Sequence, residues 1–87
     1  MEINEILNER KKTHGNFTEQ ATTARMLKNV FWRTNNELTF EQSEAIDMIL
    51  HKIARIAAGD PNVPDHWDDI AGYAKLVADA LRQQKEN

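Results

Sequence analysis

The segment 39–59 constrains the fold of this chain more than any other part of the sequence. Thr39 and Gln42 form a capping box, in which two side chains satisfy the free backbone amides at the start of a helix. Gly59 is a signal for the end of that helix. Apolar residues recur between these signals at helical spacing: Phe40, Ile46, Ile49, Ile53 and Ile56. The pattern predicts a long amphipathic helix whose apolar face belongs to the core.

Two helices are predicted before this segment. Residues 2–13 carry a thin apolar stripe, and Gly15 follows as the residue that ends the helix. Asn16 and Glu19 form a second capping box, which starts a helix that we expect to end near residue 33. The stripe of the first helix is narrow, so this helix needs a neighbour to pack against.

A fourth helix is predicted after Gly59. Asp65 is expected to be its N-cap, and a polar, fraying tail is expected from about residue 83. Signals for β-hairpins are missing. The sequence therefore predicts a single all-α domain over residues 1–87. We expect a small bundle of about four helices, in which the third and fourth form a central antiparallel hairpin.

Size and charge exclude several classes of function. The chain has 87 residues and no cysteine, so it has no disulfide, thiolate zinc site or cysteine nucleophile. Eleven Lys and Arg against fourteen Asp and Glu give a net charge of −3, which disfavours direct nucleic-acid binding. The chain has no apolar run of membrane-spanning length, and we expect a soluble intracellular protein. A domain this small, without covalent staples, is expected to self-associate or to pack very regularly.

The third helix carries a polar stripe that is the main candidate site. It consists of Glu44, Asp47, His51 and Arg55, with Lys52 beside it. An antiparallel hairpin around the short loop places Arg55 level with Asp69 of the fourth helix, and His51 level with Tyr73.

This polar layer has three interpretations. The first is a structural network that consists of an Arg–carboxylate pair and a His–Tyr hydrogen bond. The second is a solvated face, and the third is an anion site. In the anion site, Lys52 and Arg55 hold a phosphate, His51 donates, and Tyr73 offers a hydroxyl or a stacking ring, next to Asp69. Gly72 lies at the same level of the fourth helix. A glycine inside a helix suggests close approach of a backbone or ligand, or ordinary packing of small residues.

A magnesium site is a weaker alternative. Asp65 and Asp69 are one turn apart and could bind Mg²⁺ with help from Glu44 or Asp47. The other interpretation of the two aspartates is helix capping and compensation of the helix dipole. Apart from Mg²⁺ in the first interpretation, no cofactor is expected.

The two tryptophans are expected to anchor the core or a partner surface. Trp32 lies near the end of the second helix and Trp67 near the start of the fourth. Either indole could lie half exposed at an interface with another protein.

Motifs along most of the chain resemble a family of short proteins from tailed phages and prophages. They are the turn at 14–17, the helix segments 44–49 and 51–56, the Gly-Asp-Pro loop at 59–61, and the aromatic segment at 66–74. Members of that family have no established activity. The resemblance implies a viral or prophage origin and a location in the cytoplasm of a bacterial host.

Two looser resemblances concern nucleotides. Residues 41–44 and 65–68 are similar to the paired acidic motifs of the MazG-like all-α pyrophosphohydrolases, which bind magnesium and a nucleoside triphosphate, although Asp replaces Glu in the second motif. The positions Lys52, Arg55, Asp69 and Tyr73 are similar to a pattern in phage nucleotide-handling proteins.

Three functions follow as hypotheses. The first is a non-catalytic phage accessory protein that uses the hairpin to bind a nucleotide, another phosphate-bearing ligand or a host protein. The second is an inhibitor of a host defence, such as a CRISPR system, that acts by binding a protein. The third is a magnesium-dependent pyrophosphohydrolase. For each we expect a homodimer that buries the stripe of the first helix and brings Lys52 and Arg55 of two chains together.

Overall fold

The computed structural model describes residues 2–34 and 37–86 and confirms the all-α prediction. Four helices follow one another: α1 (Ile3–His14), α2 (Phe17–Thr34), α3 (Phe40–Ala58) and α4 (Pro64–Glu86). The described residues contain no strand. None of the four helices is both long and apolar enough to cross a membrane within these residues.

The helix ends follow the sequence signals closely. The Thr39 hydroxyl accepts from the Gln42 amide, and the Gln42 side chain accepts from the Thr39 amide, so the capping box is present. Asn16 Oδ1 accepts from the backbone amides of Thr18 at 2.8 Å and Glu19 at 3.3 Å. These bonds satisfy amides that have no partner inside the helix.

The prediction for the start of α4 was two residues late. Pro64, not the residue after Asp65, is the first helical residue. Proline suits this position because its fixed φ is helical and its missing N–H would have no intrahelical acceptor. Asp65 therefore lies inside the first turn, and α4 continues through the polar residues up to Glu86.

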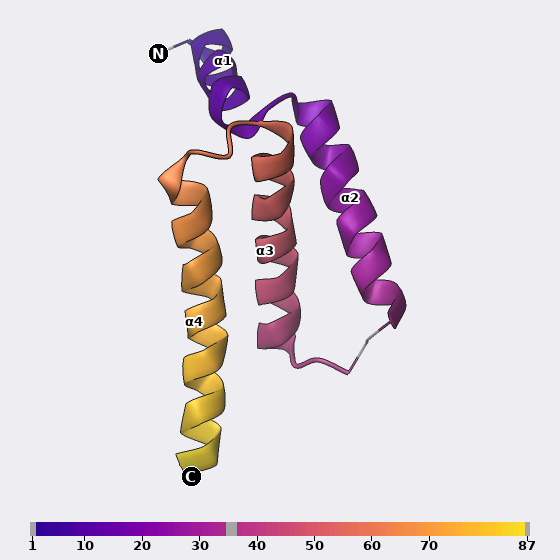
Figure 1. Cartoon of the computed structure of the whole chain (residues 1–87), viewed down its shortest axis with the longest axis vertical. Coiled ribbons are helices and arrows are strands. Elements are labelled where there is room, and N and C mark those ends of the chain that lie inside the picture. Colours follow the sequence, from indigo (N-terminus) through magenta and orange to yellow (C-terminus); the bar gives the residue numbers. More distant parts are fainter. Residues whose placement is uncertain (1, 35–36, 87) are drawn as a thin grey trace.

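The helices form a small bundle, as predicted, in which α2, α3 and α4 lie in one open layer. α3 packs between α2 and α4, and among the described residues α2 and α4 make no close backbone contact with each other. Figure 1 looks onto this layer, with α1 at the end where α2 begins and α3 stops. The extents of 50 × 27 × 22 Å and the radius of gyration of 15.3 Å describe an elongated molecule. A compact chain of this length would have a radius of gyration of about 12 Å.

Each side of α3 has a different environment. The side of Asp47 and Ala54 faces α2, and the side of Ala45 and Lys52 faces α4. The residues 44, 48, 51 and 55 follow a third side, whose end is covered by α1. The residues 46, 50, 53 and 57 follow the fourth side, and none of these four is fully buried.

The core is smaller than the apolar pattern predicts. Among the described residues, the fully buried apolar side chains are Ala24, Ala45 and Ala54. Ile53 is 38% exposed and Phe40 95% exposed, although both were expected on the core face of the third helix. The pattern was right about the helix but wrong about burial, because a single layer leaves two sides of its central helix without a neighbouring helix.

Two glycines hold α1 against the end of α3. Gly15 has φ +81°, and a Cβ built there would lie 2.0 Å from the Ala58 carbonyl oxygen. A Cβ on Gly59 would lie 2.5 Å from the Thr13 carbonyl oxygen. The same Thr13 oxygen accepts from the Asp60 amide at 3.2 Å and from His66 Nε2 at 3.0 Å. The loop after α3 thus crosses the turn after α1 at backbone contact distance, which only glycine permits.

The expectation that another backbone approaches Gly72 was wrong. It is exposed, and no atom outside its own local backbone lies within 4 Å of a Cβ built there. Neither close approach of another backbone nor small-residue packing explains this glycine, and the approach of a ligand stays a prediction. The close approach exists in this fold, but at Gly15 and Gly59.

Candidate functional site

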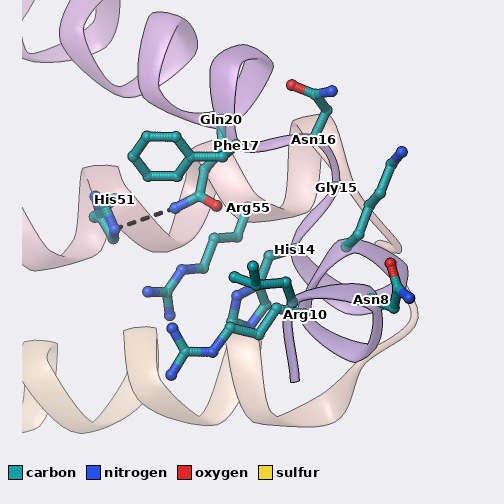
Figure 2. A pocket seen from close by; sticks show the side chains of 11 residues that line it. Asn8, Arg10, His14, Gly15, Asn16, Phe17, Gln20, His51 and Arg55 are labelled. Atoms are coloured by element: carbon teal, nitrogen blue, oxygen red, sulfur yellow. Dashed lines mark hydrogen bonds between the residues drawn. The ribbon is translucent and has the colours of Figure 1, made fainter. Parts of the chain in front are cut away.

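A cavity of about 420 Å³ lies where α1, the start of α2 and the end of α3 meet. α1 contributes Leu7, Asn8, Arg10, Lys11 and His14. The turn and α2 contribute Gly15, Asn16, Phe17 and Gln20, and α3 contributes His51 and Arg55. Figure 2 shows these side chains from close by, with the guanidinium groups of Arg10 and Arg55 reaching toward the same region. The volume is in the range of small-ligand sites.

The lining of this cavity is basic. Arg10, Lys11 and Arg55 lie on it together with His14 and His51, whereas no aspartate or glutamate does. Within the described part of the chain, no carboxylate forms an ion pair with any of the three cations. The chain as a whole has a net charge of −3, so this cluster is a local inversion of charge.

Arg55 is the least satisfied of these cations. Its Nε is buried and has no hydrogen-bond partner. Burial and the positive charge of Arg10 lower the pKa of Arg55, and the charge of Asp69 only partly opposes them. An arginine keeps its proton under these conditions, so the guanidinium stays charged while lacking an acceptor. An anion in the cavity would supply both the acceptor and the countercharge.

The pKa values of the two histidines of the cavity are lowered by the same surroundings. Burial is the largest cause that lowers the pKa of His14, followed by the charges of Arg55, His66 and Arg10. Burial, then Arg55, lowers the pKa of His51 in the same way. Both imidazoles are therefore neutral at pH 7.

The contact between His51 and Gln20 agrees with a neutral imidazole. Gln20 Nε2 lies 3.2 Å from His51 Nε2, drawn as the dashed line in Figure 2. An amide nitrogen can only donate, so this contact assigns the acceptor role to His51 Nε2 and its proton to Nδ1. Gln20 is buried, so this bond fixes the His51 ring at the wall of the cavity.

Apolar side chains stand beside the cationic groups. The Phe17 ring is 78% exposed and the Leu7 side chain 53% exposed, and both line the cavity. Exposed aromatic rings next to cations are typical of sites that bind a planar group carrying phosphate. The start of α2, where the helix dipole is positive, lies at the same wall.

The structure divides the predicted polar layer. His51 and Arg55 line the cavity, whereas Lys52 points to the other neighbour, α4, and its Nζ lies 2.9 Å from Asp69 Oδ2. Tyr73 lies with apolar residues in a separate groove between α3 and α4. The predicted pair of His51 with Tyr73 was wrong, and so was the choice of Arg55 as the ion-pair partner of Asp69. The reason is that residues at one level of a helix point in different directions.

The four candidate metal ligands do not come together. Asp69 is paired with Lys52, Asp47 Oδ1 accepts from Trp32 Nε1 at 3.0 Å, and Glu44 lies in the groove with Tyr73. Asp65 lies in the first turn of α4. Over residues 2–34 and 37–86, no group of three or more His, Asp or Glu is placed to hold a metal ion.

The tryptophans take different positions. The Trp32 ring is half-buried, packs edge-on against Phe31 and donates to Asp47 from α2 to α3. Trp67 is 54% exposed, and its Nε1 donates to the Pro61 carbonyl oxygen at 2.8 Å. Trp32 thus joins two helices, and Trp67 presents most of its ring to the surface.

Sequence reasoning missed most residues of the cavity. Leu7, Arg10, Lys11 and His14 recur at spacings of three, one and three, so they share one side of α1. Three of these four carry a basic side chain. This stripe of one apolar and three basic residues was a signal in the sequence for one wall of the cavity. The residues of α3 that it faces could not be predicted, because their position depends on the crossing of Gly15 and Gly59.

Comparison with known proteins adds a family but no activity. A family model described as "Domain of unknown function (DUF6378)" matches residues 2–81. No curated protein and no solved structure matches the chain. Because the family model covers all four helices from α1 to most of α4, this chain belongs to the DUF6378 family of unknown function.

Proposed function

We propose that this protein binds a phosphate-bearing ligand of the nucleotide class, without catalysis, in the cavity between α1, α2 and α3. The observation that carries the proposal is a set of cations, Arg10, Lys11 and Arg55, that face one cavity with no carboxylate among the lining residues. The proposal keeps the ligand class suggested by the sequence but places it on the side of α3 next to the one that carries Lys52, away from the Lys52–Asp69 pair.

Like charges near one another raise the free energy of the folded protein, and the pKa of Arg55 is lowered first by burial and then by the positive charge of Arg10. A phosphate removes this repulsion and accepts charge-assisted hydrogen bonds, each of which contributes about 1.5–3 kcal/mol. Binding therefore gains from groups that destabilise the empty site.

Phe17 favours a nucleotide over a bare phosphate. Its ring is largely exposed on the same cavity as the cations, and stacking of a base on an aromatic ring contributes about 1–3 kcal/mol. A ligand with a planar base and a phosphate can use both features at once.

Isothermal titration calorimetry with purine and pyrimidine nucleotides tests this proposal. Arg55→Gln should weaken binding about 10- to 100-fold, because it removes one charge-assisted contact. Arg33→Gln is the matched control, since Arg33 is an exposed arginine near the other end of α2. Binding that Arg33→Gln weakens as much as Arg55→Gln, or no binding of any nucleotide at millimolar concentration, would refute the assignment.

A second pair of variants tests the role of the ring. Phe17→Leu should weaken binding of a nucleoside monophosphate but leave binding of ribose 5-phosphate unchanged. Phe40→Leu is the control, because Phe40 is the most exposed phenylalanine and lines a different groove. Equal losses for both ligands would show that Phe17 does not stack on a base.

A second candidate function is binding of another protein through the groove between α3 and α4. Tyr73, Leu76 and Val77 line it with Phe40, and Leu76 is 67% exposed. This groove supports the hypothesis of a protein that inhibits a host defence. Capture of one host protein that is lost with Leu76→Asp but retained with Met26→Asp would support it, since Met26 is similarly exposed on α2.

The biological setting is also a proposal. The resemblance of the segments 14–17, 44–56 and 66–74 to phage and prophage proteins supports a viral accessory protein that acts in the cytoplasm of a bacterial host. Detection of the protein in infected or induced cells, in the soluble fraction, is the corresponding test.

A further inference from the structure

The central helix α3 has one apolar side that no other helix covers within residues 2–34 and 37–86. This free stripe consists of Ile46, Leu50, Ile53 and Ala57, at spacings of four, three and four, so they lie in one line along the helix. Ile53 and Ala57 are exposed, and Ile46 and Leu50 are only half-buried. The most apolar helix of the chain thus presents a row of aliphatic side chains to solvent.

The position of this stripe follows from the cavity on the other side. Two positions along a helix correspond to a rotation of about 200°, so residues 46, 53 and 57 lie opposite residues 44, 51 and 55. His51 and Arg55 line the cationic cavity under α1. The free stripe is therefore on the face of the layer away from that cavity.

The flanking helices extend the apolar face. On α2, Lys28 and Trp32 line a polar hollow with Asp47, and Val30, two positions from each, lies on the opposite side with 62% of its surface exposed. On α4, Leu76 lines a groove with Glu44 of the cavity side, and Trp67, nine positions earlier and so about 180° around the helix, lies on the opposite side with 54% of its surface exposed. All three helices of the layer thus contribute apolar side chains to one face.

The exposed area of the chain is large for its mass. The accessible surface is 6720 Å², whereas a compact protein of 10.0 kDa exposes about 5,200 Å². The excess of about 1,500 Å² exceeds the roughly 800 Å² that each partner buries in a standard stable interface. A layer that faces a second layer would remove such an excess, and folded domains have at least two packed layers.

We propose that this apolar face packs on the same face of a second copy of the chain, with α3 against α3, to form a two-layer assembly of six helices. A second copy suits the face for two reasons. In a dimer with a two-fold axis each chain presents the same surface to the other, so the two layers of three helices have identical helix spacing. The charged residues of α3 (Glu41, Glu44, Asp47, Lys52 and Arg55) all lie off the free stripe, so two stripes meet without like charges.

The assembly differs from the dimer expected from the sequence. In it, the cationic cavities of the two chains lie on opposite outer faces, so each protomer keeps its own cavity. Lys52 and Arg55 of the two chains do not meet. Formation of this dimer does not depend on the ligand proposed above.

Sedimentation velocity and cysteine cross-linking test the dimer. The wild-type chain should sediment at twice its mass of 10.0 kDa. Because the chain has no native cysteine, single variants Ile46→Cys, Leu50→Cys and Ile53→Cys report on the stripe alone. At least one should form a disulfide-linked dimer under mild oxidation, the one nearest the two-fold axis.

The control is Met48→Cys, which lies on the opposite side of α3, two positions from both Ile46 and Leu50. It should not cross-link above background. A wild-type chain that stays monomeric at about 100 µM overturns the proposal and leaves the face to a different protein. Cross-linking of Met48→Cys as readily as of all three stripe variants overturns it as well, because the contact would then not be on this face.

Discussion

The crossing of Gly15 and Gly59 should be the most sensitive point of the fold to a single methyl group. At Gly15 a Cβ would meet the Ala58 carbonyl oxygen at 2.0 Å, and the φ of +81° is unfavourable for any other residue. At Gly59 the Cβ would meet the Thr13 carbonyl oxygen at 2.5 Å, without a positive φ. Both contacts are with backbone, which cannot rotate away as a side chain could.

The size of the destabilisation follows from the backbone strain and from the hydrogen bonds that the added methyl group would break. An alanine in the left-handed region costs about 1–2 kcal/mol. Separating the two chain segments also strains or breaks the bonds from the Asp60 amide and His66 Nε2 to the Thr13 carbonyl, each contributing about 1 kcal/mol. Gly15→Ala should therefore destabilise the protein by about 3–4 kcal/mol and Gly59→Ala by about 2 kcal/mol. At about 4–8 °C per kcal/mol, Gly15→Ala should lower Tm by more than 10 °C.

Thermal and urea denaturation of Gly15→Ala, Gly59→Ala and Gly72→Ala at equal protomer concentration measure these effects. Gly72→Ala is the control, because space is open around Gly72 and alanine is favoured over glycine inside a helix by up to about 1 kcal/mol. It should raise Tm slightly. Gly15→Asn is a second test, since Gly15 combines its positive φ with ψ −172°, a conformation that asparagine does not tolerate either, so this variant should be destabilised like Gly15→Ala. If Gly15→Asn were as stable as the wild type, the backbone crossing would not be the reason for glycine.

Two further predictions concern charge. Burial and nearby cations lower the pKa values of His14 and His51, so both imidazoles should take up protons when an anion binds. Sulfate, whose charge is constant over this pH range, should therefore bind about tenfold more tightly at pH 5.5 than at pH 7.5. Calorimetry at constant ionic strength checks this; the same pH dependence in a His14→Gln, His51→Gln double variant would contradict it. The two members of the Lys52–Asp69 pair should contribute unequally to stability. Asp69→Asn should lower the urea midpoint more than Lys52→Met, because Asp69→Asn leaves a buried ammonium without a partner. In Lys52→Met, methionine fills the same volume and the carboxylate that remains is half-exposed. The hydrogen bond from Lys52 lowers the pKa of Asp69. The stability that the ionised Asp69 contributes is therefore present above the ordinary pKa of an aspartate and is lost as the pH falls through the lowered pKa. Lys52→Met should remove this loss of stability in acid.

The helices could be predicted because their signals are local. The capping box of Thr39 and Gln42, the cap at Asn16 and the stops at Gly15 and Gly59 each act within four residues, and each is present in the structure. Which glycine allows close approach is a different question, because it depends on segments far apart in the sequence. Gly72 looked suitable inside its helix, but its neighbourhood is empty, whereas the loop after α3 passes over the turn after α1.

The candidate site could not be predicted because α3 has four different sides rather than two. Successive residues point about 100° apart, so His51 and Lys52 cannot face the same neighbour, although both looked like parts of one polar layer. Lys52 pairs with α4, whereas His51 meets α2 and the cavity. The cavity exists only because the glycine crossing holds α1 over the His51 and Arg55 side. The same crossing keeps α1 away from the opposite side, where the apolar stripe remains available to a second chain, so one backbone contact determines both the proposed ligand site and the proposed interface.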